Sequence, residues 1–326
     1  MIKLPRRRFL QLAAGAAALP TLAAFATAQV YPARPARIVV GYPPGGVSDI
    51  VARLMAQWLS ERLGQPFIVE NRPGASGNIA TEVVVHAPPD GHTLLMVDPS
   101  PIINATLQGK LNFNFINDIV PVATIIRQPL VMVVHPSVPA KTVPEFTAYA
   151  KANPGTINMI SPGNGTPPHM AGELFKMMAG VNMVHVPYRG AAPAMIDLIA
   201  GQVQLYFCTI AASIEYIRTD KLRALAVTTA ARSEVLPDIP TVGDFVLGYE
   251  MSAWFGIGVP KMTPTEIIDR LNREINAALA DLRIKAQLAD YGGGEFALSP
   301  AEFGKLIADE TDKWAKVVRF AGIKPD

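Results

Sequence analysis

The sequence has 326 residues, half of them apolar and 17% charged, which is long enough for two domains with sizeable hydrophobic cores. The formal charge of +2 is unevenly distributed, because the first 28 residues hold four basic residues and no acidic ones. Of the 29 basic residues, 25 therefore lie in the rest of the chain, together with all 27 acidic residues. This balance excludes a strongly basic surface, and we expect no nucleic-acid partner.

Residues 1–28 have the pattern of an export signal. Three arginines at positions 6–8 form a basic region of twin-arginine type, residues 12–25 are apolar and rich in alanine, and Ala26-Thr27-Ala28 fits a cleavage site. A membrane anchor is the weaker alternative, because the apolar stretch is shorter than the roughly 20 residues that a span needs. We predict a periplasmic protein that is cleaved near Ala28 after twin-arginine or general secretory export.

The stretch from residue 37 to residue 63 has a pattern of strand, loop and helix that later parts of the chain repeat. An apolar run at 37–41 predicts a buried strand, and apolar residues at helical spacing predict a helix from Ile50 to Leu63. The loop between them is rich in proline and glycine, and Ser48 or Asp49 can cap the helix. Unpaired amides and the positive end of the helix dipole together form an anion site. We predict that this loop holds a carboxylate; the alternative is a turn that binds nothing.

The same pattern of strand, loop and helix recurs along the chain. We expect strands at 67–70, 93–97, 157–160, 183–186 and 222–227, and helices at 79–86, 144–153, 169–179, 193–200, 264–291 and 300–321. Strands that alternate with helices indicate parallel sheets, in which ligands lie outside the carboxyl ends of the strands. Two apolar runs, 122–126 and 130–135, flank residues 127–129, where we place a crossing between domains.

Enzyme signatures are absent from the sequence. The segment Gly46–Ile50 lacks the closing glycine of a nucleophile elbow, and Pro168 replaces the third glycine of a dinucleotide fingerprint that starts at Gly163. The five histidines lack the spacing of metal ligands. We expect no catalytic residue, no cofactor and no metal. His169, beside one of the loops, is either a ligand contact or a capping residue.

Cys208 is the only cysteine, so no internal disulfide can form and the fold must rest on its core. It lies in a predicted strand at 203–208. Cys208 could be either a buried, inert thiol or a nucleophile, and the buried thiol is the preferred interpretation.

Several motifs of this chain resemble the extracytoplasmic solute receptors of tripartite tricarboxylate transporters, the Bug or TctC-type family. The resemblance runs through nearly all of the sequence after the export signal. It is carried by residues 43–49 (PPGGVSD), 69–75 (VENRPGA), 89–94 (PDGHTL), 186–190 (VPYRG), 225–228 (LAVT) and 253–256 (AWFG).

This resemblance implies an α/β fold of the type II periplasmic-binding-protein kind, with two lobes of mostly parallel sheet joined by a hinge. It places the first lobe at 29–127 and 253–326 and the second lobe at 128–252. The cleft between the lobes would close on a small organic acid, which is a di-, tri- or aromatic carboxylate. Membrane permease subunits would then recognise the closed form.

The resemblance also implies which residues bind the acid, mostly through backbone amides and hydroxyls. The candidates of the first lobe are Gly45, Gly46, Val47, Ser48 and Asn78, and those of the second lobe are Gly163, Asn164, Gly165, Thr166, Tyr188, Gly190 and Ala191. Asp49 is expected to cap or to act through water, His169 to contact the ligand or cap, and Arg189 to bind a second carboxylate or remain solvated. Cys208 departs from the family, in which many relatives have an acidic residue just after this strand, and this argues against an amino-acid ligand.

Two other functions remain open at this point. In the first, the closed form of a sensor subunit docks on a two-component membrane kinase instead of a permease. In the second, Ser48, His169 and Asp49 form the catalytic group of an exported hydrolase.

Overall fold

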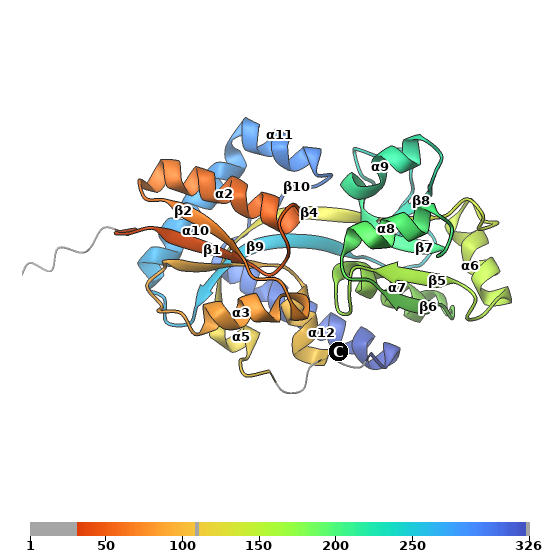
Figure 1. Ribbon diagram of the computed structural model, residues 1–326, viewed down its shortest axis with the longest axis horizontal. Helices are drawn as coiled ribbons and strands as arrows, with labels where there is room; N and C mark the ends of the chain where they lie inside the picture. The colour runs from red at the N-terminus through yellow and green to blue at the C-terminus, as the bar shows by residue number, and fades with distance from the viewer. Residues whose placement is uncertain (1–30, 108–110, 324–326) are drawn as a thin grey trace, which may run out of the picture.

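The fold was obtained as a computed structural model that describes residues 31–107 and 111–323. The predicted export signal therefore lies outside the described residues. Figure 1 shows two halves, each with a sheet and helices packed on it. The predicted two-lobed α/β fold is confirmed. Within the described ranges, no helix combines the length and the apolar character needed to cross a bilayer.

The first lobe is built on a sheet with the strand order β2-β1-β3-β9-β4, in which β10 also pairs with β4. Strands β1, β2 and β3 are parallel to one another, as the pattern of strands and helices predicts. The elements of this lobe are β1 (Ala36–Val40), α2 (Val47–Leu63), β2 (Phe67–Asn71), η1 (Ala75–Gly77), α3 (Asn78–Val85), β3 (Thr93–Val97), α4 (Ser100–Leu107) and α5 (Phe115–Asp118).

The second lobe is built on a sheet with β5, β6 and β7 parallel, and β4 antiparallel to both β7 and β8. Its elements are α6 (Val143–Ala152), β5 (Asn158–Ser161), α7 (Pro167–Ala179), β6 (Val184–Pro187), α8 (Ala191–Ile199), β7 (Leu205–Thr209), α9 (Ile210–Arg218), β8 (Arg223–Val227) and η2 (Val242–Asp244).

Two strands join the lobes, and they make the sheets mixed where mostly parallel sheets were expected. The two apolar runs predicted around residues 127–129 form one continuous strand, β4 (Ile119–Val134). It pairs with β9 (Ser252–Pro260) as far as Pro129 and with β7 from Leu130 onward, antiparallel in both cases. The chain thus passes from one sheet to the other without leaving β4.

The hydrophobic core of the first lobe confirms the predicted apolar face of α2. Val51, Met55 and Leu59 are fully buried and pack in one cluster with Ile38 and Val40 of β1. At about 25 cal/mol per Å² of apolar surface, burying such side chains stabilises the fold by about 1.5–3 kcal/mol each. This packing fixes the orientation of α2 and therefore the position of its first turn.

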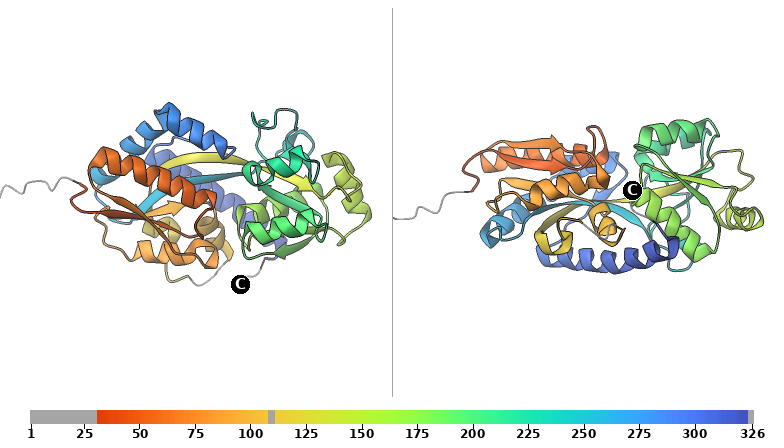
Figure 2. Two further views of the ribbon diagram at one scale, coloured as in Figure 1. Left: turned by 45° about the horizontal axis from the view of Figure 1, so that its top comes forward. Right: turned by 60° about the horizontal axis from the view of Figure 1, so that its bottom comes forward.

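The C-terminal segment departs from the sequence prediction at one helix. The helix expected at 264–291 is two helices, α10 (Thr265–Ala280) and α11 (Leu282–Asp290), because the Asp281 carboxylate accepts from the amides of Arg283 and Ile284 and caps a new helix. After β10 (Gly294–Glu295), α12 (Pro300–Ala321) extends along both lobes (Figure 2). Phe303 packs in the first lobe and Trp314 in the second. The division of the chain into lobes at 29–127, 128–252 and 253–326 stays a prediction. Helix α12, which this division assigns to the first lobe, packs against both lobes.

Candidate functional site

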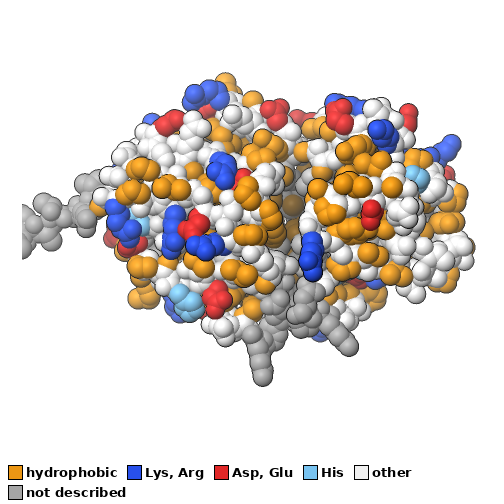
Figure 3. Space-filling view, in the orientation of Figure 1, with side chains coloured by type: hydrophobic (Ala, Val, Ile, Leu, Met, Phe, Trp, Pro, Cys, Tyr) orange, Lys and Arg blue, Asp and Glu red, His pale blue; other side chains and the backbone are white. Residues whose placement is uncertain are grey.

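The carboxyl ends of the parallel strands of both lobes face each other. In the first lobe these ends lead into α2, α3 and α4, and in the second into α7, α8 and α9. A hydrogen bond of 2.9 Å from the Ser76 hydroxyl to the Asn164 carbonyl oxygen joins the loop after β2 to the loop after β5. Figure 3 shows the surface hollowed between the two halves. Most of the residues predicted to bind the ligand lie on the loops around this gap.

The first turn of α2 is the clearest candidate for an anion site on the gap. Gly46 is its N-terminal flanking residue, and no side chain caps the helix, so the expected capping by Ser48 or Asp49 is not found. The first amides of a helix have no acceptor within the helix. Ser48 is only 5% exposed, and its hydroxyl has no hydrogen-bond partner among the described residues. Amides of the first turn and one buried hydroxyl are thus available at this point.

Asp49 faces its own lobe. Its carboxylate accepts from the Gly45 amide at 3.0 Å, from the Asn71 side chain at 2.9 Å and from two nitrogens of Arg53. Burial alone raises the pKa of Asp49, but the hydrogen bonds from Arg53, Gly45 and Asn71 hold it below its ordinary value. The charge is therefore neutralised inside the lobe, and the Gly45 amide, predicted to bind the ligand, is already engaged.

The second loop of the first lobe brings Asn78 to the site as the first residue of α3, with 5% of its surface exposed. The Asn104 side chain lies 3.4 Å from its Oδ1 atom and also donates to the Ser76 carbonyl oxygen at 3.2 Å. Ala75 and Ser76 both have positive φ, 47° and 50°, which non-glycine residues rarely adopt. Ser76, which contacts Asn164 of the second lobe, and Asn104, which holds Ser76 and Asn78 within the first lobe, were missed in the sequence, because no local pattern marks either contact.

In the second lobe, the loop at 161–166 offers fewer amides than predicted. The Gly163 amide donates to the Ser161 hydroxyl at 3.2 Å, and the Gly165 amide donates to His169 Nδ1 at 3.1 Å. The Thr166 hydroxyl donates to the Gly163 carbonyl oxygen at 2.7 Å. The next two residues are prolines, which have no N–H to donate. The loop is therefore stabilised by hydrogen bonds to its own residues and to His169, and the amides of both its glycines already have acceptors.

His169 lies behind this loop. It is 2% exposed; its Nδ1 accepts from Gly165, and its Nε2 lies 3.7 Å from a carboxylate oxygen of Glu173. Both ring nitrogens therefore face groups of the same lobe. A direct contact between His169 and the ligand stays a prediction without geometric support.

The loop at 187–192 is also partly occupied. The Gly190 amide donates to the Pro162 carbonyl oxygen at 3.2 Å, and the Tyr188 hydroxyl donates to Asp197 at 2.6 Å. This hydrogen bond, together with burial, raises the pKa of Tyr188 to about 12. Arg189 is exposed. Ala191 begins α8, which has no side-chain cap, so the first turn of α8 presents amides without intrahelical acceptors.

A further helix start was missed in the sequence. Strand β7 runs directly into α9 at Thr209 and Ile210, and no side chain caps this helix. No proline or glycine marks the junction, so no sequence signal was present. The neighbouring Cys208 is 1% exposed with its Sγ atom 4.0 Å from the Val131 carbonyl oxygen, and burial raises its pKa to about 12. Cys208 therefore does not lie at the gap. Of the two roles considered for it, the structure favours the buried thiol over the nucleophile.

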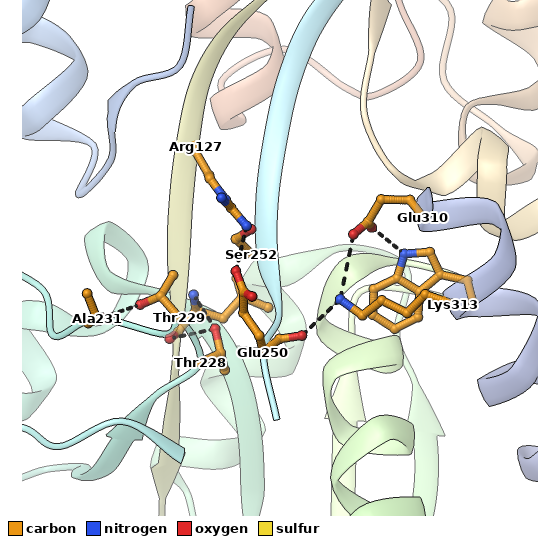
Figure 4. Close-up of polar contacts among 10 residues, drawn as sticks. Arg127, Thr228, Thr229, Ala231, Glu250, Ser252, Glu310 and Lys313 are labelled. Atoms are coloured by element: carbon orange, nitrogen blue, oxygen red, sulfur yellow. Dashed lines mark hydrogen bonds and ion pairs between the residues drawn. The ribbon is translucent and has the colours of Figure 1, made fainter. Parts of the chain in front are cut away.

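The crossing between the lobes is tied by a polar network (Figure 4). Arg127 of β4 donates to the Ser252 hydroxyl at 2.7 Å and to the Glu250 carboxylate at 2.6 Å. Lys313 of α12 donates to the Glu250 carbonyl oxygen at 2.9 Å. The Thr228 hydroxyl accepts from the Leu130 amide at 2.9 Å, at the point where β4 stops pairing with β9 and begins to pair with β7. Strands β4 and β9 and helix α12 are therefore connected by hydrogen bonds at this crossing.

Two hollows of the described surface lie outside the gap. One, of about 140 Å³, lies between α2 and α11, and the other, of about 320 Å³, lies beside β8. Neither is lined by a residue predicted to bind the ligand. Within the described part of the chain, no group of His, Cys, Asp and Glu side chains is arranged to hold a metal ion. The gap between the lobes is therefore the candidate site.

Comparison with known families is consistent with this geometry. Residues 51–323 match the model of the family described as "Tripartite tricarboxylate transporter family receptor" (TctC). Among curated proteins, BugT of Bordetella pertussis is 37% identical over 308 residues, covering 93% of this chain and 94% of BugT.

Solved structures agree with the sequence comparison. R. palustris Rpa4515 with adipate superposes with a TM-score of 0.83 at 36% identity, covering 91% of this chain and all of that one. MatC from Rhodopseudomonas palustris with bound malate superposes with a TM-score of 0.79 at 30% identity, covering 88% of this chain and all of that one. Both neighbours hold a carboxylic acid.

Proposed function

We propose that this chain, which belongs to the tripartite tricarboxylate transporter receptor family, captures a small organic acid in the periplasm and presents it to membrane permease subunits. The proposal includes export by the signal at residues 1–28 and closure of the two lobes around the acid.

The observation that carries the proposal is the first turn of α2. Its amides have no intrahelical acceptors, and the buried Ser48 hydroxyl has no partner among the described residues. A buried hydroxyl without a partner costs about 1–3 kcal/mol, which a ligand oxygen at this point would recover. A carboxylate matches both the donors and the positive end of the helix dipole.

The second lobe contributes the remaining donors in this proposal. The first turns of α8 and α9 lie at the carboxyl ends of β6 and β7 and have no side-chain caps. A hydrogen bond to a charged group contributes about 1.5–3 kcal/mol, and micromolar affinity needs about 8 kcal/mol. Three to five such bonds, divided between the lobes, are sufficient without an arginine clamp.

Closure follows from this division of donors. Because both sets surround the acid only when the gap is shut, the ligand stabilises the closed state by its differential affinity. The hydrogen bond from Ser76 to Asn164 already joins the two edges and supports such a state. Permease subunits would distinguish the closed form from the open one by the relative position of the lobes.

The adipate and malate in the two solved neighbours favour a carboxylic acid as the ligand class for this chain. The contacts of the possible catalytic residues argue against the hydrolase alternative. His169 accepts from Gly165, and Asp49 pairs with Arg53, so neither is oriented as a base for Ser48.

The test is a thermal-shift screen of the mature protein with aliphatic and aromatic carboxylates, amino acids and sugars. A ligand at about 100 times its Kd adds about 2.7 kcal/mol to the free energy of unfolding, so the melting temperature rises. We expect carboxylates to produce this shift. A sugar that succeeds where every carboxylate fails would refute the proposal.

Ser48→Ala examines the site itself. Loss of one hydrogen bond worth about 1.4 kcal/mol weakens carboxylate binding about tenfold in calorimetry. The melting temperature of the ligand-free variant is expected not to fall, because the removed hydroxyl has no partner. Ser137→Ala, at an exposed serine of the second lobe, is the matched control and leaves affinity unchanged.

A further inference from the structure

Two histidines are stacked behind the loop at 161–166. His169 lies in the first turn of α7 and His185 lies in β6, and their ring centroids are 3.6 Å apart with an interplanar angle of 12°. His169 is 2% exposed, and His185 is half-buried. They come from elements that are separate in the sequence, and they meet directly under one of the loops that border the gap.

Each ring is hydrogen-bonded to one glycine amide of this loop, His169 directly and His185 through the Ser161 hydroxyl. His169 Nδ1 accepts from the Gly165 amide at 3.1 Å. His185 Nε2 lies 2.7 Å from the Ser161 hydroxyl, which in turn accepts from the Gly163 amide at 3.2 Å. Gly163 and Gly165 have φ values of 149° and 69°, which are left-handed conformations that a glycine leaves easily. The two rings thus restrain the most adaptable positions of the loop.

His169 supplies an acceptor to the loop. Its Nδ1 atom accepts from the Gly165 amide, so a side chain without an acceptor at this position would leave that amide unpaired. Two charged groups face the pair. A carboxylate oxygen of Glu173 lies 3.7 Å from His169 Nε2, and Lys176 forms an ion pair of 2.9 Å with Glu173.

His185 is the second support of the loop. Burial is the largest cause that lowers the pKa of His185 to about 3, so the ring is neutral at neutral pH and bonds the Ser161 hydroxyl through Nε2.

We propose that His169 and His185 are positioning residues of the ligand-binding loop, and that the acceptor at His169 Nδ1 holds the Gly165 amide in the arrangement that binds the ligand. This proposal rests on the proposed carboxylate site, but its effect on the loop exists without ligand. The pair fixes the loop at 161–166 opposite the first turn of α2, and loss of the acceptor at Nδ1 would allow the loop to move.

The first test uses the full mature protein without ligand. We expect the NMR amide signal of Gly165 to shift in His169→Phe, which removes the acceptor, and to stay near its wild-type position in His169→Asn, whose side-chain oxygen replaces Nδ1. His86→Asn, at an exposed histidine of the first lobe, leaves the signal unchanged. A Gly165 signal that moves equally in the Phe and Asn variants, or in neither, would overturn the proposal.

The second test measures adipate binding at neutral pH. We expect His169→Asn to bind about as well as wild type. His169→Phe fills the same space without an acceptor, and we expect about tenfold weaker binding, as for one lost hydrogen bond. Equal affinities of the Asn and Phe variants would contradict a positioning role. If no carboxylate binds at all, the proposed function fails, while the NMR shifts still decide the role of the pair.

Discussion

At the scale of single residues, Ser48 and Asp49 show how two neighbours at the start of one helix acquire opposite roles. Both are buried, with 5% and 3% of their surface exposed. Ser48 has a hydroxyl without a partner among the described residues, whereas the carboxylate of Asp49 is surrounded by donors of its own lobe. The first is suited to a ligand, and the second fixes the loop that presents it.

We expect Asp49→Asn to lower the free energy of unfolding by about 1–3 kcal/mol, because Arg53 loses its charged partner and the Gly45 amide an acceptor. The pKa of Asp49 is depressed in the folded state, so its contribution is present above the unfolded pKa of about 4 and is lost as the pH falls through the folded value. Urea unfolding at neutral and acidic pH measures both effects. Asp269→Asn, on an exposed face of α10, is the control with no expected change. A variant as stable as wild type at neutral pH would show that Asp49 does not hold the loop.

At the scale of elements, the position of α7 depends on one glycine inside the helix. A Cβ atom at Gly172 would lie 1.7 Å from the Met159 sulfur of β5. The helix therefore packs closely on the strand, and this packing determines where the loop at 161–166 begins and ends. Gly304, inside α12, differs, because the nearest atom to its Cβ position is Pro121 Cγ at 3.7 Å.

These two glycines give a matched pair of substitutions. Gly172→Ala gains helix propensity but overpacks β5, so we expect a net loss of about 1–3 kcal/mol in the free energy of unfolding. Gly304→Ala keeps ordinary contacts and is expected to gain up to about 1 kcal/mol. Chemical denaturation measures both. Similar changes of the same sign would mean that propensity, and not the contact with Met159, decides the effect.

At the scale of the whole molecule, three connections and one contact determine how the lobes are placed. Strands β4 and β9 and helix α12 join the lobes, and Arg127, Glu250 and Lys313 tie these elements together. The hydrogen bond from Ser76 to Asn164 joins the two loops that border the gap. In the proposed closure it forms only when the two edges meet, so it would favour the closed form.

We expect Ser76→Ala to weaken carboxylate binding by about threefold to tenfold, the effect of one hydrogen bond worth about 0.7–1.4 kcal/mol in the closed form. Small-angle X-ray scattering should show a larger radius of gyration for the ligand-free variant. Ser76→Gly is the companion variant, because it also loses the hydroxyl but relieves the positive φ of 50°. Both variants should bind more weakly, and only Ser76→Gly should gain stability. Unchanged affinity in both would remove Ser76 from the closing mechanism.

The sequence by itself determined the strands, the helices and the loops that lead into them, because hydrophobic periodicity, proline and glycine act within a few residues. It also identified the family and the two-lobed fold through motifs spread along the chain. Only the tertiary structure decided which amides remain available, since the side-chain orientations of Asp49, Ser161 and His169, which accept from Gly45, Gly163 and Gly165, are set by packing, and Gly190 donates to the distant Pro162. The start of α9 has no proline or glycine to mark it. The contact of Ser76 with Asn164 and the stacked histidines join segments whose distance in space has no local signal in the sequence.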